Sequence, residues 1–304
     1  MNAPRLGDYE IHRAWEGFSS IRQVSSGEIM HSRTAPMEEA RQLYVGQAHL
    51  AERLRGRKEA EPVVLWDVGL GAAANAMAAL RCYEEIASRQ STRPFQIISF
   101  ENDLDSLRLA VANPDDFPYV AHAAPAALLA RGEWQSDAFP GLSWVLIHGD
   151  FLKTMSDAAA APDLIFYDMF STRTSSELWS WGTFRRLFEQ CRGRAVELFT
   201  YTCSTANRAA LLAAGFHVAR GRNAGAKVET TIALTPAAAG SATATRRHML
   251  SRSWLEKWDR SAAKFPGDVA PADRPAFEKL IREHKQFRKS AGPERLPAMT
   301  RNSG

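Results

Sequence analysis

The sequence predicts an α/β fold, a doubly wound, mainly parallel sheet with an antiparallel last strand. Between about residues 63 and 236, short apolar runs alternate with helical stretches, as expected for strands that are buried on both faces and joined by crossover helices. Near the end of this region, the runs 216–219 and 228–234 flank a glycine-rich segment that is too short to hold a helix. The last two strands are therefore expected to pair antiparallel.

Five strands and their helices are expected in the central region. The strands are 63–67, 96–101, 144–150, 163–170 and 195–202. A glycine-bearing turn and an Ala-rich helix follow the first strand, and further helices are expected at 103–112, 175–190 and 204–214. Ser204 and Gly215 are typical start and stop residues for the last of these helices.

The chain is expected to have three parts: residues 1–60, 61–236 and 237–304. The first holds a predicted hairpin (20–24 with 28–32) and a helix from Pro36 to about residue 54, and it is expected on the substrate side. The central part is the predicted sheet. The last part is predicted to be a low-complexity linker followed by two helices, at about 251–263 and 273–288.

Composition excludes several classes of protein. In 304 residues, no apolar run approaches the roughly 18 residues that span a bilayer, and the first residues lack a hydrophobic signal core. Three cysteines form no disulfide framework or zinc knuckle, and the eight histidines are scattered. We therefore expect a cytoplasmic protein with neither membrane nor metal as a partner.

The net charge of +4 is unevenly divided. Residues 237–304 hold 14 Lys/Arg and 7 Asp/Glu, whereas residues 1–236 hold 24 and 27. Basic groups contact phosphates and aromatic rings stack on unpaired bases, so the last segment is a candidate RNA-binding region. Trp254 and Trp258 are also four residues apart, which equally favours a helix docked on the core. The basic residues interleaved with them are Arg246, Arg247, Arg252, Lys257, Lys285, Arg288 and Lys289; Arg53, Arg55, Arg57 and Lys58 form a second cluster, or a solvated helix end.

Acidic side chains stand at the ends of four predicted strands. They are Asp67, Glu101, Asp150 and Asp168. Because the carboxyl ends of parallel strands meet at one edge of the sheet, this arrangement predicts a nucleoside site. Glu101 is suited to accept from ribose hydroxyls and Asp150 from an adenine amine, although any one of these residues alone can be a simple loop cap. The small residues after Asp67 would let the polar tail of a ligand approach the backbone.

The glycine turn, which reads GLGAAA from Gly69, narrows the range of nucleoside ligands that the site is expected to bind. A dinucleotide needs a pyrophosphate cradle, usually GxGxxG, and that motif tolerates alanine at its last position. The acidic companions and the antiparallel ending favour S-adenosylmethionine, which carries no phosphate. An NAD-dependent oxidoreductase is the alternative.

Five segments resemble the methyltransferase part of the bacterial tRNA 5-methylaminomethyl-2-thiouridine biosynthesis (MnmC-like) family. Four lie in the central region and read VVLWDVGLGAAANAMAAL, IISFE, HGD and LIFYDMFSTRTSSELWS; the fifth lies upstream and reads GEIMHSRTAPMEEARQLYVGQAHL. The resemblance covers about residues 17–236. It implies a Rossmann-like class I methyltransferase fold, S-adenosyl-L-methionine as cofactor, and N-methylation of an aminomethyl group on a modified wobble uridine of tRNA. It also implies an FAD-dependent oxidase in the same pathway, which we expect as a separate protein.

The resemblance further implies roles for individual residues. Asp168 would face the methyl group and the acceptor amine, orienting the amine and accepting its proton; alternatively, it only caps the turn. Around it, Phe170 and Trp179 would shape the acceptor pocket, whereas Tyr167 and Trp66 are expected in the core. The cofactor's methionine moiety would be lined by Asp67, Gly69, Gly71 and Asn75, its ribose held by Glu101 and its adenine by Asp150.

The chain also departs from the family pattern. Leu70 and Ala72-Ala73 replace an aromatic residue and Thr-Gly, Ser171-Thr172 replace Ala-Pro, and the segment before Trp179 lacks a proline. Two alternatives therefore stay open. One is a diverged methyltransferase for another small-molecule or peptide acceptor, and the other is a non-catalytic RNA-binding or assembly protein with the same fold.

Overall fold

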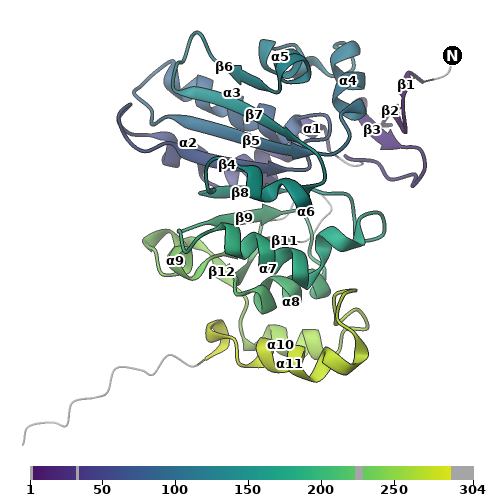
Figure 1. The fold of residues 1–304 in the computed structure, drawn as a ribbon, viewed down its shortest axis with the longest axis vertical. Helices are drawn as coiled ribbons and strands as arrows, with labels where there is room; N and C mark the ends of the chain where they lie inside the picture. The colour runs from purple at the N-terminus through teal and green to yellow at the C-terminus, as the bar shows by residue number, and fades with distance from the viewer. Residues whose placement is uncertain (1–2, 32–33, 223–228, 289–304) are drawn as a thin grey trace, which may run out of the picture.

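The central feature of the computed structural model, which describes residues 3–31, 34–222 and 229–288, is a mainly parallel sheet (Figure 1). Within these residues nine strands form it in the order β12-β10-β11-β9-β8-β4-β5-β7-β6. The pairs β4–β5, β4–β8, β5–β7 and β8–β9 are parallel, which confirms the predicted doubly wound sheet. The five parallel strands are β4 (Val63–Val68), β5 (Phe95–Glu101), β7 (Leu142–His148), β8 (Leu164–Tyr167) and β9 (Glu197–Thr200).

The antiparallel end of the sheet is also as predicted. Strand β11 (Thr230–Leu234) lies between β9 and β10 (His217–Gly221) and runs antiparallel to both. The glycine-rich turn between them falls mostly on residues 223–228, outside the described residues. Two further edge strands, β6 (Glu133–Gln135) and β12 (His248–Met249), were not predicted, because runs of two or three residues are too short to show a period.

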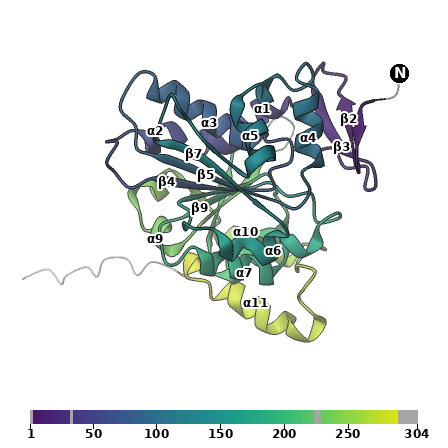
Figure 2. The ribbon, with the colours of Figure 1, turned by 45° about the horizontal axis from the view of Figure 1, so that its top comes forward.

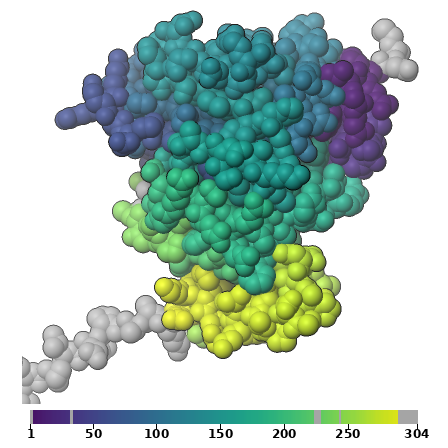
Figure 3. Space-filling view, viewed as in Figure 1, coloured from purple at the N-terminus to yellow at the C-terminus, as the bar shows by residue number. Residues whose placement is uncertain are grey.

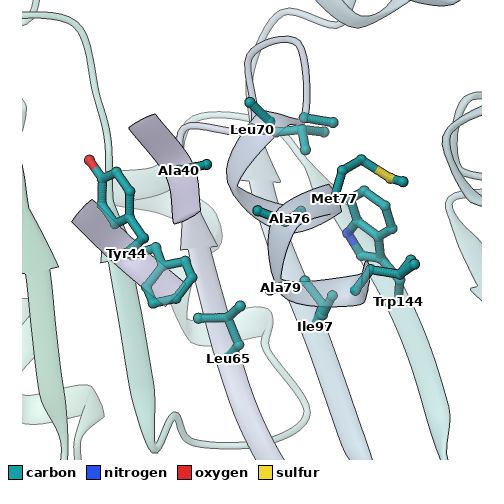
Figure 4. Packing of buried hydrophobic residues seen from close by; sticks show 14 of the residues in the cluster. Ala40, Tyr44, Leu65, Leu70, Ala76, Met77, Ala79, Ile97 and Trp144 are labelled. Carbon is teal, nitrogen blue, oxygen red and sulfur yellow. The ribbon is translucent and has the colours of Figure 1, made fainter. Parts of the chain in front are cut away.

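Helices cover both faces of the sheet (Figure 2). Successive side chains of a strand point to opposite faces, so Leu65 belongs to one apolar core and Trp66 to the other. In Figure 4, Leu65 and Ile97 lie beneath the small Ala76 and Ala79, which let their helix approach the sheet closely. The first core includes α1 (Pro36–Ala40), α2 (Leu50–Leu54), α3 (Ala74–Ala87), α4 (Asp105–Ala112) and α5 (Ala123–Arg131); the second includes α6 (Phe151–Thr154), α7 (Trp181–Gln190) and α8 (Thr205–Ala214).

The helix ends follow local capping. The Ser204 hydroxyl accepts from the Asn207 amide, and Gly215 ends α8 with a φ of +109°, as predicted. The helix expected over 175–190 is interrupted, because Ser180 caps a new helix and accepts from the Thr183 amide. The residues before it, Ser176–Trp179, form a 3₁₀ turn.

The predicted N-terminal hairpin is reduced to one antiparallel bridge, between Arg22 and Ile29, and the main partner of its first strand lies upstream instead. Strand β3 (Ser19–Gln23) pairs with β2 (Tyr9–Arg13), which in turn pairs with β1 (Arg5–Leu6). The buried Tyr9 and Ile11 explain this choice, because pairing with β2 covers an apolar face. The described residues of the segment predicted as its partner (28–32) contact β3 through one bridge, between Arg22 and Ile29, and through a hydrogen bond from the His31 amide to the Ser20 hydroxyl (3.0 Å).

The single helix predicted from Pro36 to residue 54 is divided into pieces. Helix α1 continues into a π-helical turn at Arg41–Gly46, and His49, with a φ of +49°, precedes α2. Gln47 ties this break to the sheet, since its side-chain amide donates to the Leu43 carbonyl (2.8 Å) and to the Thr230 hydroxyl (3.2 Å).

The predicted low-complexity linker is ordered in the structure. Thr235 caps a short helix, α9 (Pro236–Ala239), and a 3₁₀ turn at Ala242–Arg246 leads into β12. Helices α10 (Arg252–Asp259) and α11 (Arg274–Arg282) then form the lobe at the bottom of Figure 3. Asp268 joins this lobe to the body by accepting from the Trp181 and Gly182 amides at the start of α7.

The C-terminal tryptophans belong to the core. Trp254 and Trp258 are 1% and 0% exposed, so the docking alternative holds and base stacking by these rings is wrong. Their spacing of four residues gives α10 one apolar face, which packs inward. Several basic residues of the segment are engaged in ion pairs: Arg246 with Glu52, Arg247 with Glu197, and Arg282 with Asp259.

No helix in the described ranges has the length and apolar character needed to cross a bilayer.

Candidate functional site

A cavity of about 720 Å³ lies at the carboxyl ends of β4, β5 and β8. Four stretches line it: the glycine turn after β4, the acidic residues after β5, the loop after β8, and the N-terminal segment between Tyr9 and Glu39. This is the edge of the sheet where the sequence placed a ligand. Of the nine predicted site residues, the lining includes Gly69, Gly71, Asn75, Glu101, Asp168 and Phe170.

The glycine turn brings backbone to the cavity. Gly69 and Gly71 have φ values of +90° and +52°, where side chains are rare. A Cβ at position 69 would lie 2.7 Å from the carbonyl oxygen of Asp168, so a larger residue would also push the β8 loop away. The amide of Gly71 donates to Glu101 (2.9 Å), which ties the turn to the end of β5.

Glu101 is held at the cavity by backbone amides. Its other carboxylate oxygen accepts from the amides of Asn102 (2.9 Å) and Asp103 (3.2 Å). Burial raises the pKa of Glu101, and the three amide hydrogen bonds oppose that rise. The carboxylate is therefore fixed in direction before any ligand arrives, as a ribose-binding acid requires.

Asp168 faces the cavity beside Asn75. The Asn75 side-chain amide donates to the Asp168 carboxylate (2.7 Å), and among the described residues the amide oxygen of Asn75 is buried without a partner. Burial raises the pKa of Asp168, Glu39 raises it further, and His31 and Asn75 oppose the rise. A carboxylate with a raised pKa is a better proton acceptor near neutral pH. The turn-cap alternative would have the Asp168 side chain accept from a backbone amide of its own turn. In the structure it accepts from the Asn75 side chain instead.

The remaining three predicted residues lie outside the cavity lining. Asp67 is fully buried behind the turn, accepts from the Ser99 hydroxyl (2.7 Å), and has its pKa raised by burial to about 7. Asp150 caps α6 by accepting from the Leu152 amide (2.9 Å). Trp179 supports the wall from behind, because its indole N–H donates to the Phe170 carbonyl (2.7 Å). For Asp67 and Asp150, strand position indicated the right edge of the sheet but did not fix the direction of the side chains.

The N-terminal segment supplies residues that the sequence did not single out. Glu28, His31 and Glu39 line the cavity, and the His31 ring lies 3.4 Å from the Glu39 carboxylate. The available signal was the MnmC-like resemblance of the segment from Gly27 onward, which marks it as part of the same unit without naming a role for each side chain.

The lining is strongly acidic. Among the described residues it includes six carboxylates, and Arg173 is its only Lys or Arg. This charge suits a cationic ligand such as S-adenosylmethionine and repels the pyrophosphate of a dinucleotide. The unpartnered amide oxygen of Asn75 and the glycine backbone at positions 69 and 71 likewise fit its ammonium and carboxylate ends. The carboxylates belong to Glu28, Glu39, Glu101, Asp103, Asp168 and Glu177.

Comparisons with known proteins agree with this chemistry. Residues 131–236 match a family described as S-adenosyl-L-methionine-dependent methyltransferase. The chain is 27% identical over 219 residues to the tRNA 5-methylaminomethyl-2-thiouridine biosynthesis bifunctional protein MnmC of Pseudomonas aeruginosa, covering 71% of this chain and 33% of the relative. It is 25% identical over 223 residues to the MnmC of Ralstonia nicotianae, covering 69% and 32%. The chain thus spans about a third of the length of these relatives.

A solved structure shows the same fold. The crystal structure of MNMC2 from Aquifex aeolicus superposes with a TM-score of 0.64 at 22% identity, covering 91% of this chain and 84% of that one. Fold, acidic cavity and family match together identify the chain as an S-adenosyl-L-methionine-dependent methyltransferase of the class I fold. Within that class, the proteins that it resembles over about 220 residues are the MnmC proteins. These matches favour S-adenosylmethionine over the NAD-dependent alternative.

Proposed function

We propose that the chain methylates the nitrogen of an aminomethyl group on a modified wobble uridine of tRNA. The observation that carries this proposal is the Asp168 carboxylate, which faces an acidic cavity between the glycine turn and the N-terminal segment. A primary amine enters such a cavity readily as a cation and needs a proton acceptor there. The name of the MnmC relatives specifies a methylaminomethyl group, the product expected from this reaction.

The glycine-turn side of the cavity is assigned to the cofactor. Gly69 and Gly71 would leave room for its amino-acid tail against the backbone, with Asn75 beside them, and Glu101 would accept from its ribose. Asp67 would act from behind by fixing the turn, and Asp150 would meet the adenine amine at the sheet edge. When bound, S-adenosylmethionine supplies an electrophilic methyl group on a sulfonium.

The acceptor side is assigned to Asp168 and its surroundings. The amine must lose a proton to expose its lone pair, and the raised pKa of Asp168 suits its carboxylate to orient the nitrogen and take that proton. Phe170, supported by Trp179, would close this side against water. Rate enhancement would come mainly from holding the amine in line, since orientation alone lowers barriers by roughly 7–11 kcal/mol in favourable cases.

The proposed substrate also sets the partners. tRNA is the macromolecular partner, which would place the reaction in the cytoplasm, and a separate FAD-dependent oxidase would act in the same pathway. Because Trp254 and Trp258 are buried, RNA contacts by the C-terminal segment would come from its basic side chains rather than from these rings.

A methyl-transfer assay tests the proposal. The purified chain is incubated with methyl-labelled S-adenosylmethionine and bulk tRNA from a strain that lacks wobble-uridine methylation, and the tRNA is then digested to nucleosides. Label in the methylaminomethyl nucleoside is the expected result. Absence of label from tRNA, with transfer to a small amine or a peptide instead, would show that the acceptor has diverged.

A further inference from the structure

One carboxylate joins the N-terminal segment to the loop after β8. One oxygen of Glu28 accepts from the backbone amide of Ser171 (2.8 Å). The other accepts from the Ser171 hydroxyl (2.9 Å) and the Thr174 hydroxyl (2.6 Å). These three contacts, called here the Glu28 contacts, bridge more than 140 positions of sequence. Hydrogen bonds to an ionised acceptor are shorter and stronger than neutral ones.

Glu28 is itself anchored. Its carbonyl accepts from the Gln23 amide at the end of β3 (2.8 Å), and its amide donates to the Ser26 hydroxyl (3.2 Å). The sheet that carries it is attached to the body through Asp116, which accepts from Arg13 (2.8 Å) and from the Ser19 hydroxyl (2.6 Å). The backbone that carries the Glu28 carboxylate is therefore held by hydrogen bonds within the N-terminal segment, and that segment is in turn bonded to the body of the protein.

The loop that it holds forms one wall of the cavity. Its first part is secured without Glu28, because the Tyr201 hydroxyl donates to the Met169 carbonyl (2.9 Å) and Trp179 donates to Phe170. Beyond Phe170 the chain makes a turn in which the Ser171 carbonyl accepts from the Thr174 amide (2.9 Å). In the described structure, Glu28 accepts three hydrogen bonds from this turn and so joins it to the N-terminal segment.

We propose that Glu28 is a positioning residue for the methyl acceptor. Glu28 fixes the turn at residues 171–174. This turn continues the cavity wall that begins at Asp168 and Phe170, so fixing it keeps the wall in the conformation that binds the acceptor. The inference rests on the proposed function, since it takes this side of the cavity as the acceptor side. Glu28 does not act on the cofactor side, where Glu101 and the glycine turn are held by their own backbone contacts.

The same contacts give the departures of the β8 loop from the family pattern a physical meaning. Ser171, one of these departures, supplies one hydroxyl donor, and Thr174 supplies the other. A chain without both would leave the Glu28 carboxylate with the backbone amide alone. Loss of the contacts would release the turn into several conformations. The apparent affinity for the acceptor would then decrease in proportion to the fraction of molecules whose turn keeps the binding-competent conformation.

A double-mutant cycle tests the proposal. Glu28→Gln removes the charge at constant size, and Ser171→Ala with Thr174→Val removes the hydroxyl donors from the other side. Each variant and the combination are compared with Glu10→Gln, a control in the same N-terminal sheet whose carboxylate pairs with Arg22 outside the cavity. If Glu28→Gln folds poorly, the Ser171→Ala/Thr174→Val variant still tests the same contacts from the other side.

Trypsin gives a readout that is independent of any acceptor. Arg173 is exposed and lies inside the held turn, so cleavage after it reports on the turn directly. We expect cleavage at this bond, followed by mass spectrometry, to be about tenfold faster in Glu28→Gln and in the hydroxyl variant, with no further increase on combination. The control should cleave like wild type.

Kinetics and binding complete the test. KM for tRNA should rise about tenfold in Glu28→Gln, whereas affinity for S-adenosylhomocysteine should stay within twofold of wild type. Equal cleavage and equal KM in folded Glu28→Gln and wild type would overturn the inference. If wild type methylates no tRNA, the proposed function fails instead, and the cleavage rates still decide whether Glu28 fixes the turn.

Discussion

The two walls of the cavity are built in different ways. The cofactor wall consists of the turns that directly follow β4 and β5, and it is held by backbone, as in the three amides that fix Glu101. The acceptor wall joins the N-terminal segment to the loop after β8 through side chains such as Glu28. The first wall follows from the fold itself, whereas the second depends on particular residues far apart in sequence, and under the proposed function it is the wall that would set acceptor choice.

The largest effect is expected at Asp168, where the two walls meet. Asp168→Asn keeps the size of the side chain but removes the proton acceptor, so methyl transfer should fall on the order of 10³-fold, within the usual range for a general base. Single-turnover rates with saturating cofactor measure the loss. Affinity for S-adenosylhomocysteine, the control, should change less than threefold. Undiminished transfer would show that Asp168 only shapes the loop.

A pH-dependent effect should come from Asp67, behind the cofactor wall. Its pKa of about 7 in the folded chain exceeds the ordinary 3.8, so the folded state retains a proton that the unfolded state loses. The free energy of unfolding should therefore decrease as pH rises from about 4 to 7, by about 3–4 kcal/mol at 1.4 kcal/mol per pKa unit.

Asp67→Asn isolates that contribution, because asparagine still accepts from Ser99 but does not titrate. Denaturant unfolding of both proteins without cofactor, at several pH values, should show the variant gaining stability relative to wild type as pH rises through this window. Parallel profiles for the two proteins would contradict a buried, protonated Asp67.

Gly69→Ala should damage the cofactor wall. It adds a side chain at a φ of +90° and 2.7 Å from the Asp168 carbonyl. We expect a loss of about 2 kcal/mol in stability, of which strained backbone alone accounts for about 1. Gly17→Ala is the matched control, with a φ of +87° and open space around it. Equal losses by denaturant unfolding would mean that the β8 loop makes way freely.

The smallest effect concerns Asp150. Asparagine there still caps α6 but presents an amide donor in place of the second carboxylate oxygen. If the carboxylate meets the adenine amine as proposed, Asp150→Asn lowers affinity for S-adenosylhomocysteine about tenfold, equivalent to about 1.4 kcal/mol, without loss of stability. Asp150→Ala should lose about 1 kcal/mol of stability in addition. Unchanged affinity in both variants would reduce Asp150 to a helix cap.

The difference between the walls also explains what was predictable from sequence. The glycine turn, the strand-end acids and the antiparallel ending are local patterns with local causes, so the sheet and most of the cofactor wall were predicted. Side-chain direction was not, because β4 runs one residue further than expected and Asp67 lies inside it. On the acceptor wall, Asp168 and Phe170 were predicted, but the part supplied by the N-terminal segment was missed, because nothing in a single sequence links Glu28 to Ser171.

Long-range pairing was the common cause of the other errors. β3 pairs with an upstream strand that had not been recognised, and the presumed linker after residue 236 continues into the sheet edge. The spacing of Trp254 and Trp258 allowed both docking and stacking, and only the packed core decided between them.

Calorimetric titration of S-adenosylhomocysteine into wild type, Gly69→Ala and Asp168→Asn tests the two-wall account most directly. We predict binding to wild type and to Asp168→Asn with affinities within threefold of each other, and binding at least tenfold weaker to Gly69→Ala. Loss of binding in Asp168→Asn together with full binding in Gly69→Ala would contradict the assignment of the two walls.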